Sequence, residues 1–202
     1  MTKKIRSHNV VSSHQKINAV NLSEGALVTQ LTPAKFLDAI WPAKLLTNET
    51  LELRLIDRNT NRIRREFFRS AKELLERSQH IEGHDVYFGV STRFGESGTK
   101  RDCYRVKCAW LDLDDCKVSD CNFDIKPDVV VDSGGGVHAY WLLKTPMLVR
   151  DERWLEIEAV NRGLCKKFNG DIAAIDVSRI LRVPGTVNTK YIPLRDVRAY
   201  AL

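Results

Sequence analysis

The sequence predicts an α+β fold, in which strands alternate with amphipathic helices. Several short runs alternate apolar and polar residues, as half-buried strands do, and other runs repeat apolar residues at helical spacing. Two strand-like runs also enclose residues 133–136, a glycine-rich turn typical of a hairpin. This mixture favours an α+β sandwich over a doubly wound parallel sheet.

The composition is that of a globular protein. The chain has 202 residues, 43% of them hydrophobic and 29% charged, which suits one domain or one domain with a small appendage. An excess of 32 basic over 26 acidic residues gives a net charge of +6, so we expect a polyanionic partner such as nucleic acid. No apolar run approaches the roughly 18 residues of a membrane span, and no signal peptide is evident. Five cysteines without a secretory signal indicate reduced thiols and a cytoplasmic location.

The first half of the chain begins with a polar segment, residues 1–30, which lacks a sustained period and is expected to be loosely ordered. Thr32 and Pro33 then form a helix start, and the helix stops near Trp41. Residues 51–55 alternate like a strand. Apolar residues from Ile63 to Leu75 predict an amphipathic helix ending near Ser78, whose basic face is either a nucleic-acid track or, more commonly, a solvated surface.

The second half begins with a strand at residues 86–90 and a polar loop. The chain then continues as a strand at 108–114, the hairpin, and a helix capped by Asp151 that ends at Asn169. We expect His138 and Tyr140, which share one face of the second hairpin strand, to lie on the side of a cleft. Residues 172–175 are predicted to lead as a strand into Asp176, and residues 177–184 to form a turn or two of helix with Arg179 and Arg182 on one face.

The strand at 108–114 ends in acidic residues. Asp112 and Asp114 point to the same side and repel each other unless a cation lies between them; hard divalent cations prefer such carboxylates. Asp176 is a candidate third carboxylate. Three acids could hold two metal ions that activate an attacking oxygen. The alternatives are a solvated acidic turn at Asp112 and a helix cap at Asp176.

The glycine turn at residues 133–136 offers backbone amides that an anion can approach closely. His138 could donate to a phosphate, and Arg179 and Arg182 could clamp a triphosphate. The ordinary explanations are a simple turn, a structural histidine and local ion pairs. Four cysteines flank the acidic strand, at spacings looser than those typical of zinc sites, and leave a structural zinc site open: Cys103, Cys108, Cys116 and Cys121.

These segments together resemble the archaeo-eukaryotic primase superfamily, in particular the primase-polymerase domains of plasmids and phages. The similar pieces are residues 86–93, 110–114, 133–141 and 176–190, in that order. The resemblance implies a two-layer palm-like antiparallel sheet related to the RNA-recognition fold, joined to an N-terminal α/β unit. It divides the chain into a unit at about 31–83 and a palm-like module at about 84–202, within one catalytic domain.

The resemblance also implies a function. It implies a DNA primase or DNA polymerase that joins nucleoside triphosphates on a single-stranded DNA template and primer, with two Mg²⁺ or Mn²⁺ ions held by Asp112, Asp114 and Asp176. It assigns further residues to the nucleotide: His138, Arg179, Arg182, Ser133, Arg93 and Lys190. From its shared face with His138, Tyr140 is expected to face the sugar. A helicase, in the same chain or separate, is a possible partner in replication of a plasmid, phage or similar element.

Two other functions fit parts of the pattern. A rolling-circle replication endonuclease has a similar sheet, but it needs two histidines around one apolar residue, and only His138 is present here. A nucleic-acid-binding module without catalysis is the second alternative. The presence of Asp112, Asp114 and Asp176 speaks against it.

Overall fold

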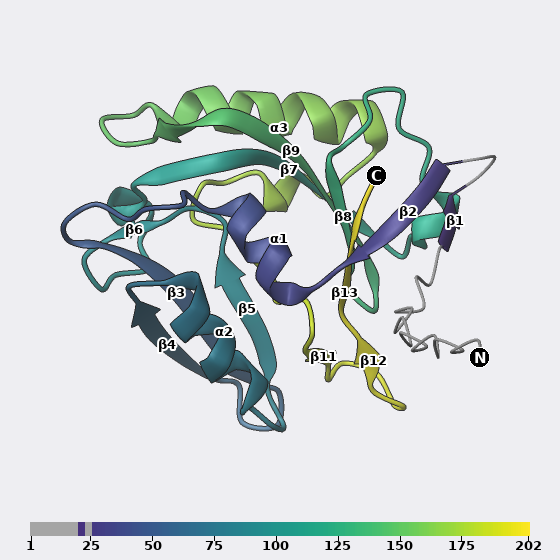
Figure 1. Cartoon of the computed structure of the whole chain (residues 1–202), viewed down its shortest axis with the longest axis horizontal. Coiled ribbons are helices and arrows are strands. Elements are labelled where there is room, and N and C mark those ends of the chain that lie inside the picture. Colours follow the sequence, from purple (N-terminus) through teal and green to yellow (C-terminus); the bar gives the residue numbers. More distant parts are fainter. Residues whose placement is uncertain (1–19, 23–25) are drawn as a thin grey trace, which may run out of the picture.

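The structure, a computed structural model, describes residues 20–22 and 26–202, which form two large antiparallel sheets and one two-stranded sheet (Figure 1). The larger sheet has six strands in the spatial order β1 (Val20–Leu22), β2 (Ala26–Leu31), β13 (Arg198–Ala201), β8 (Val129–Asp132), β9 (Gly136–Leu148) and β7 (Arg105–Asp114). Its strands pair antiparallel throughout. The predicted α+β class with an antiparallel sheet is therefore confirmed.

The smaller sheet follows the order β10 (Ile180–Arg182), β5 (Asp85–Gly89), β3 (Glu49–Asp57) and β4 (Arg62–Phe68), and β6 (Arg93–Phe94) pairs with β3. A short hairpin is formed by β11 (Val187–Asn188) and β12 (Arg195–Asp196). Three short 3-10 helices lie in the connections: η1 (Lys100–Asp102), η2 (Val118–Asp120) and η3 (Ile172–Ala174).

Helix α1 (Pro33–Ile40) joins the two sheets into one core. Its Phe36 is buried and contacts two rings edge-on, Phe88 of β5 and Tyr140 of β9, each with ring centroids 5.5 Å apart. Helix α2 (Ala71–Gln79) packs on the smaller sheet, and α3 (Trp154–Phe168) lies along the outer side of the larger one (Figure 1). Trp141 of β9 stacks on Phe168 of α3. Helix α3 thus covers one face of the larger sheet and α2 one face of the smaller sheet, while α1 packs between the two sheets.

Several predicted elements are confirmed. Thr32 caps α1 by accepting a hydrogen bond from the amide of Lys35, and Pro33 is its first residue. The strand at 51–55, the strand at 86–90, the acidic strand and the hairpin all form. Helix α3 ends where predicted, with Asn169 in the left-handed conformation at φ 56°.

The predicted helix from Ile63 to Ser78 is wrong in its first half, which is strand β4. A spacing of four, as between Ile63 and Phe67, suits one face of a helix and equally one face of a strand, because four is a multiple of two. Pairing of β4 with β3 along its whole length decides for the strand. The helix starts only after Ser70, whose hydroxyl accepts a hydrogen bond from the amide of Glu73.

Three predictions around α3 and Asp176 are also wrong. Asp151 does not cap α3, because it lies in a turn at φ 54° and the helix begins at Trp154. Residues 172–174 form the 3-10 helix η3 rather than a strand. The expected helix at 177–184 contains β10 instead. Ile180, Leu181 and Arg182 pair antiparallel with residues 87–89 of β5, which makes this segment a strand.

Strands from the expected units at about 31–83 and 84–202 pair with one another in the smaller sheet. Strands β5 and β10 come from the expected palm-like module but pair in the smaller sheet with β3 and β4. Strand β2, largely within the segment expected to be loosely ordered, pairs with β13 in the larger sheet. The rest of that expectation concerns residues 1–19 and 23–25, which lie outside the described residues. The two sheets therefore exchange strands and share one core.

Candidate active site

The acidic end of β7 lies at an edge of the larger sheet, next to β9. Asp112 pairs in register with His138, so their side chains point to the same side. The Nε2 atom of His138 lies 3.7 Å from Oδ1 of Asp112. Asp114, two residues on, points the same way and is exposed, as predicted from the alternation. The strand pairing thus brings two carboxylates and an imidazole together.

The glycine turn between β8 and β9 is held tightly against the acids. Both the amide and the hydroxyl of Ser133 donate to the carbonyl of Gly136, each at 3.0 Å. A Cβ atom on Gly136 would lie 2.2 Å from the carbonyl oxygen of Leu113, so only glycine fits here. The amide of Asp115 donates to the carbonyl of Gly135 at 3.1 Å. The hairpin therefore fixes the backbone on which Asp114 sits.

A pocket of about 190 Å³ lies in front of these groups. It brings together six of the predicted site residues, namely Asp112, Asp114, Ser133, His138, Arg182 and Lys190. Its other polar lining includes Arg58, Tyr87, Asn188 and Tyr191, which the sequence analysis did not single out. A larger groove of about 570 Å³ on the other side of the hairpin touches neither Asp112 nor His138. We place the site in the smaller pocket, because it contains both.

Asp85, at the start of β5, binds and stabilises residues of the pocket wall. Its buried carboxylate accepts hydrogen bonds from Arg182 at 2.7 Å and from the amide and hydroxyl of Thr189 at 2.8 and 2.9 Å, and it pairs with Arg58. Burial acts to raise the pKa of Asp85, but the bonds from Arg182 and Thr189 outweigh it and hold the pKa below its ordinary value. The sequence offered one signal for Asp85, an acid directly before a buried apolar strand.

Burial and neighbouring charges shift the pKa values of two pocket residues. The pKa of Asp114 is raised, first by burial and then by the neighbouring charges of Asp112 and Asp171. The pKa of His138 is lowered, chiefly by burial, although Asp112 works in the opposite direction. His138 is therefore neutral at pH 7, and its buried Nδ1 has no hydrogen-bond partner within the described residues.

The carboxylates of Asp112 and Asp114 point to the same side of β7, and a divalent cation would neutralise these two like charges. Within residues 20–22 and 26–202 the structure has no group of three or more His, Cys, Asp or Glu residues arranged as metal ligands. The carboxylate of Asp176 instead accepts from the amide of Ser178 and pairs with Arg179 at 3.0 Å. The acid beside Asp112 is Asp171, whose amide donates to the Asp112 carbonyl at 2.8 Å.

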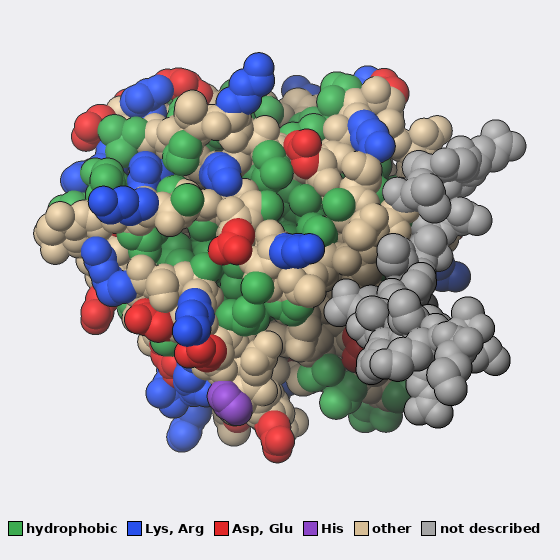
Figure 2. Space-filling model, viewed as in Figure 1, with side chains coloured by type: hydrophobic (Ala, Val, Ile, Leu, Met, Phe, Trp, Pro, Cys, Tyr) green, Lys and Arg blue, Asp and Glu red, His purple; other side chains and the backbone are tan. Residues whose placement is uncertain are grey.

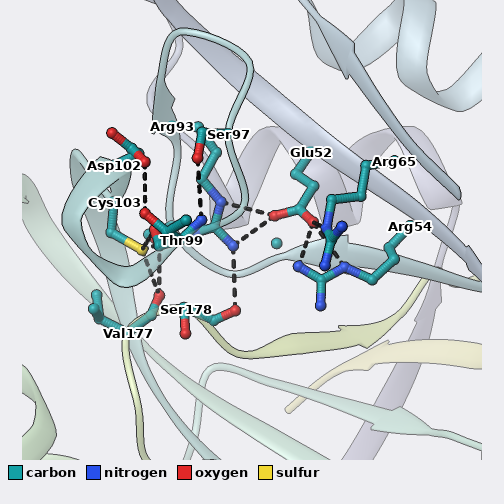
Figure 3. A network of polar contacts seen from close by, with 12 residues as sticks. Glu52, Arg54, Arg65, Arg93, Ser97, Thr99, Asp102, Cys103, Val177 and Ser178 are labelled. Atoms are coloured by element: carbon teal, nitrogen blue, oxygen red, sulfur yellow. Dashed lines mark hydrogen bonds and ion pairs between the residues drawn. The ribbon is translucent and has the colours of Figure 1, made fainter. Parts of the chain in front are cut away.

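Three other predicted site residues do not line the pocket. Arg93 is fully buried and donates to Glu52, Ser91 and the carbonyl of Ser178 (Figure 3). Tyr140 is fully buried against Phe36, and burial raises its pKa well above the ordinary value. Arg179, the third, pairs with Asp176. The sequence placed Tyr140 on the correct strand, whereas Arg93 lies in β6 rather than a loop and Arg179 precedes β10 rather than lying in a helix. It could not show which neighbours would cover these residues.

The four cysteines considered for zinc are not brought together. Cys103 precedes β7 and Cys116 follows it. Because a ten-residue strand spans about 30 Å, these two cysteines lie too far apart to bind one zinc ion. Cys108 is buried within the strand, and its pKa is raised to about 12 by burial. Only Cys116 and Cys121 are in contact, with 3.3 Å between their sulfurs. None of the helices in the described part of the chain combines the length and hydropathy that crossing a bilayer requires.

Three known proteins are similar to this chain. The AEP domain of the primase-polymerase of Cyanophage S-2L superposes with a TM-score of 0.55 at 16% identity, over 74% of this chain and 80% of that one. A crystal structure of the primase RepB′ shares 20% identity over 74% of this chain and 50% of that one, with a TM-score of 0.48. A replication protein of Clostridium perfringens is 34% identical over 64 residues, which are 32% of this chain and only 16% of that protein.

The two sheets and the core that they share have the same fold as the phage primase-polymerase domain. The model of the RepB DNA-primase N-terminal domain matches residues 71–198, more than half of the chain. The chain belongs to this family of primase-type replication domains. The suspected membership of the archaeo-eukaryotic primase superfamily is thereby confirmed.

Proposed function

We propose that this protein is a template-dependent nucleotidyltransferase that joins nucleoside triphosphates on single-stranded DNA. The observation that carries the proposal is the pocket in which Asp112, Asp114 and His138 face Arg182 and Lys190. Carboxylates at one side and cations at the other match a nucleoside triphosphate, whose phosphates need cationic partners while its reacting end needs acids.

The proposed role of each pocket residue follows from its charge. Arg182 and Lys190 would bind and orient the phosphates, and Arg182 is held in place for this by Asp85. His138, being neutral, would donate one hydrogen bond to a phosphate oxygen without adding charge. Asp112 and Asp114 would hold Mg²⁺ or Mn²⁺, which supplies charge neutralisation and lowers the pKa of an attacking 3′-hydroxyl.

Asp176 is proposed as a third acid on the family resemblance alone. Its carboxylate would have to leave Arg179 and Ser178 to take that role. Asp171 is already hydrogen-bonded to the Asp112 backbone. Comparing Asp171→Asn with Asp176→Asn would show which of the two acids the reaction requires.

The biological setting that we propose is replication of a plasmid, phage or similar element. Two findings support it, the family of RepB primase-type domains and the phage origin of a structure with the same fold. Single-stranded DNA, a primer strand and nucleoside triphosphates would be the partners.

The test is incorporation of labelled nucleotides on a single-stranded DNA template, with and without a primer, in Mg²⁺ or Mn²⁺. We expect extension that requires template and is abolished by a chelator. Products without a primer would identify a primase, and products only with a primer an extending polymerase. Cleavage of the template without extension would instead indicate the endonuclease chemistry, and binding without either reaction would indicate a non-catalytic module.

A further inference from the structure

The smaller sheet carries a cationic row on the face that points away from α2. The pairing register aligns four residues across the sheet, Arg65 with Arg54, Arg54 with Tyr87 and Tyr87 with Arg182, so all four point to the same side. Paired residues lie about 5 Å apart, and the row therefore spans about 15 Å. It begins in the pocket, which Tyr87 and Arg182 line, and ends at β4, the edge strand of this sheet.

The opposite face of this sheet is covered by α2 and carries both acidic and basic side chains. Glu66, the residue after Arg65, points to that side and pairs with Arg77 of α2 at 2.9 Å. Figure 2 shows the α1 and α2 side of the molecule, where Lys and Arg side chains are interspersed with Asp and Glu. The cationic row is thus confined to one face.

At the β4 end of the row, one carboxylate contacts three guanidinium groups. Glu52 is fully buried, and its carboxylate contacts Arg93 at 2.7 Å, Arg65 at 3.7 Å and Arg54 through its Nε at 2.8 Å. Figure 3 shows Arg93 on one side of the carboxylate and the other two on the opposite side. One negative charge cannot neutralise three positive charges, so two remain uncompensated within this cluster.

At the pocket end, one carboxylate serves two guanidinium groups, because Asp85 pairs with both Arg182 and Arg58. The pocket end also includes Lys190, Asp112 and Asp114, so it holds three cations and three carboxylates. The excess of two positive charges therefore lies at the β4 end, where three guanidinium groups share Glu52. Such an excess raises the free energy of the folded state through repulsion, and an anion that bound across it would relieve the repulsion.

We propose that this face binds the phosphates of single-stranded DNA and leads the strand to the pocket. A strand fits better than a single nucleotide, because the row continues past the pocket to the edge strand β4, where Arg65 remains 48% exposed beside the loop that contains Gly98. Guanidinium groups match phosphates in shape as well as charge. Ile63, which is exposed on the same face, offers a surface for a base. The choice of DNA rests on the proposed function, whereas the location rests on the charge excess.

The chain offers a matched pair of variants on β4. Arg65, whose side chain is 48% exposed, is on the cationic face, whereas its neighbour Arg64, 69% exposed, points to the opposite face and pairs with Glu66. We expect Arg65→Ala to weaken binding of a fluorescein-labelled oligodeoxythymidine about three- to tenfold and to reduce the slope of log affinity against log salt by about 0.7, the loss of one phosphate contact. Arg64→Ala should change neither, and Arg65→Lys should restore the slope.

Fluorescence anisotropy across a salt series measures both quantities, and thermal unfolding checks that the variants are folded. Binding of a fluorescent nucleoside triphosphate, measured in parallel, should be the same in Arg65→Ala as in the unmodified protein. Equal loss of DNA binding in Arg64→Ala and Arg65→Ala, or no loss in either, would overturn the proposal while leaving nucleotidyl transfer intact. A selective loss in Arg65→Ala combined with no nucleotide incorporation would instead refute the proposed function alone.

Discussion

At the scale of single residues, the pocket depends on buried charges that lie behind the groups lining it. Asp85 orients Arg182 and the backbone at Thr189, although its own side chain is fully buried. A sequence can show that an acid precedes a strand, but it cannot show that two arginines and a threonine, up to 104 residues away, converge on it. Asp112, Asp114 and His138, by contrast, were predictable, because their positions follow from strand alternation within short segments.

We predict that Asp85→Asn lowers the free energy of unfolding by about 3 kcal/mol at pH 7, because it leaves Arg182 buried without its counter-charge. The folded-state pKa of Asp85 lies below its ordinary value of 3.8. Its stabilisation is therefore present above about pH 4 and is lost as the pH falls through the folded-state value. Urea denaturation at pH 7 and at low pH measures this. A difference between the two proteins that stayed constant with pH would contradict the assignment.

Tyr140 gives a second prediction at this scale. Its hydroxyl is buried and lacks a hydrogen-bond partner among the described residues. Tyr140→Phe removes that unsatisfied group and should stabilise the protein by about 1 kcal/mol, measured by chemical denaturation. A loss of stability would show that the hydroxyl has a partner, and a change in the preference for ribose over deoxyribose would show that it reaches the sugar.

At the scale of elements, the structure separates patterns that the sequence leaves ambiguous. The run from Ile63 to Phe67 fits a strand and a helix equally well, and pairing with β3 decides for the strand. The start of α2 could have been placed from Ser70 and Glu73, which have the spacing of a capping box. Helix α1 was placed correctly because Thr32 and Pro33 act locally. Local capping signals were sufficient, whereas strand partners distant in sequence were not.

The hairpin between β8 and β9 allows a paired test of adjacent glycines. Gly136→Ala places a methyl group against the backbone of Leu113, which cannot move without displacing Asp114, so we expect a loss of at least about 2 kcal/mol in unfolding free energy. Gly135→Ala meets only the hydroxyl end of Tyr191, a side chain that can rotate away, and should cost less than about 1 kcal/mol. Urea denaturation of both variants tests this, and equal losses would contradict it.

At the scale of the whole molecule, the net charge of +6 is distributed unevenly. A surplus of two positive charges lies where Arg54, Arg65 and Arg93 share Glu52, on the face of the smaller sheet that leads to the pocket. The sequence could predict a polyanionic partner from the total charge. It could not predict this face, because three arginines and one glutamate from three separate strands meet there only after the sheet has formed.

The whole account depends on nucleotidyl transfer at the pocket, and the most direct measurement is the rate of single-nucleotide addition to a primed template. Asp112→Asn should reduce this rate at least about 100-fold, because it removes a carboxylate that faces His138. Asp115→Asn is the matched control: it makes the same chemical change at an exposed position with φ 51°, a conformation that asparagine readily adopts. It should leave the rate unchanged. Equal rates for the two variants would contradict the account.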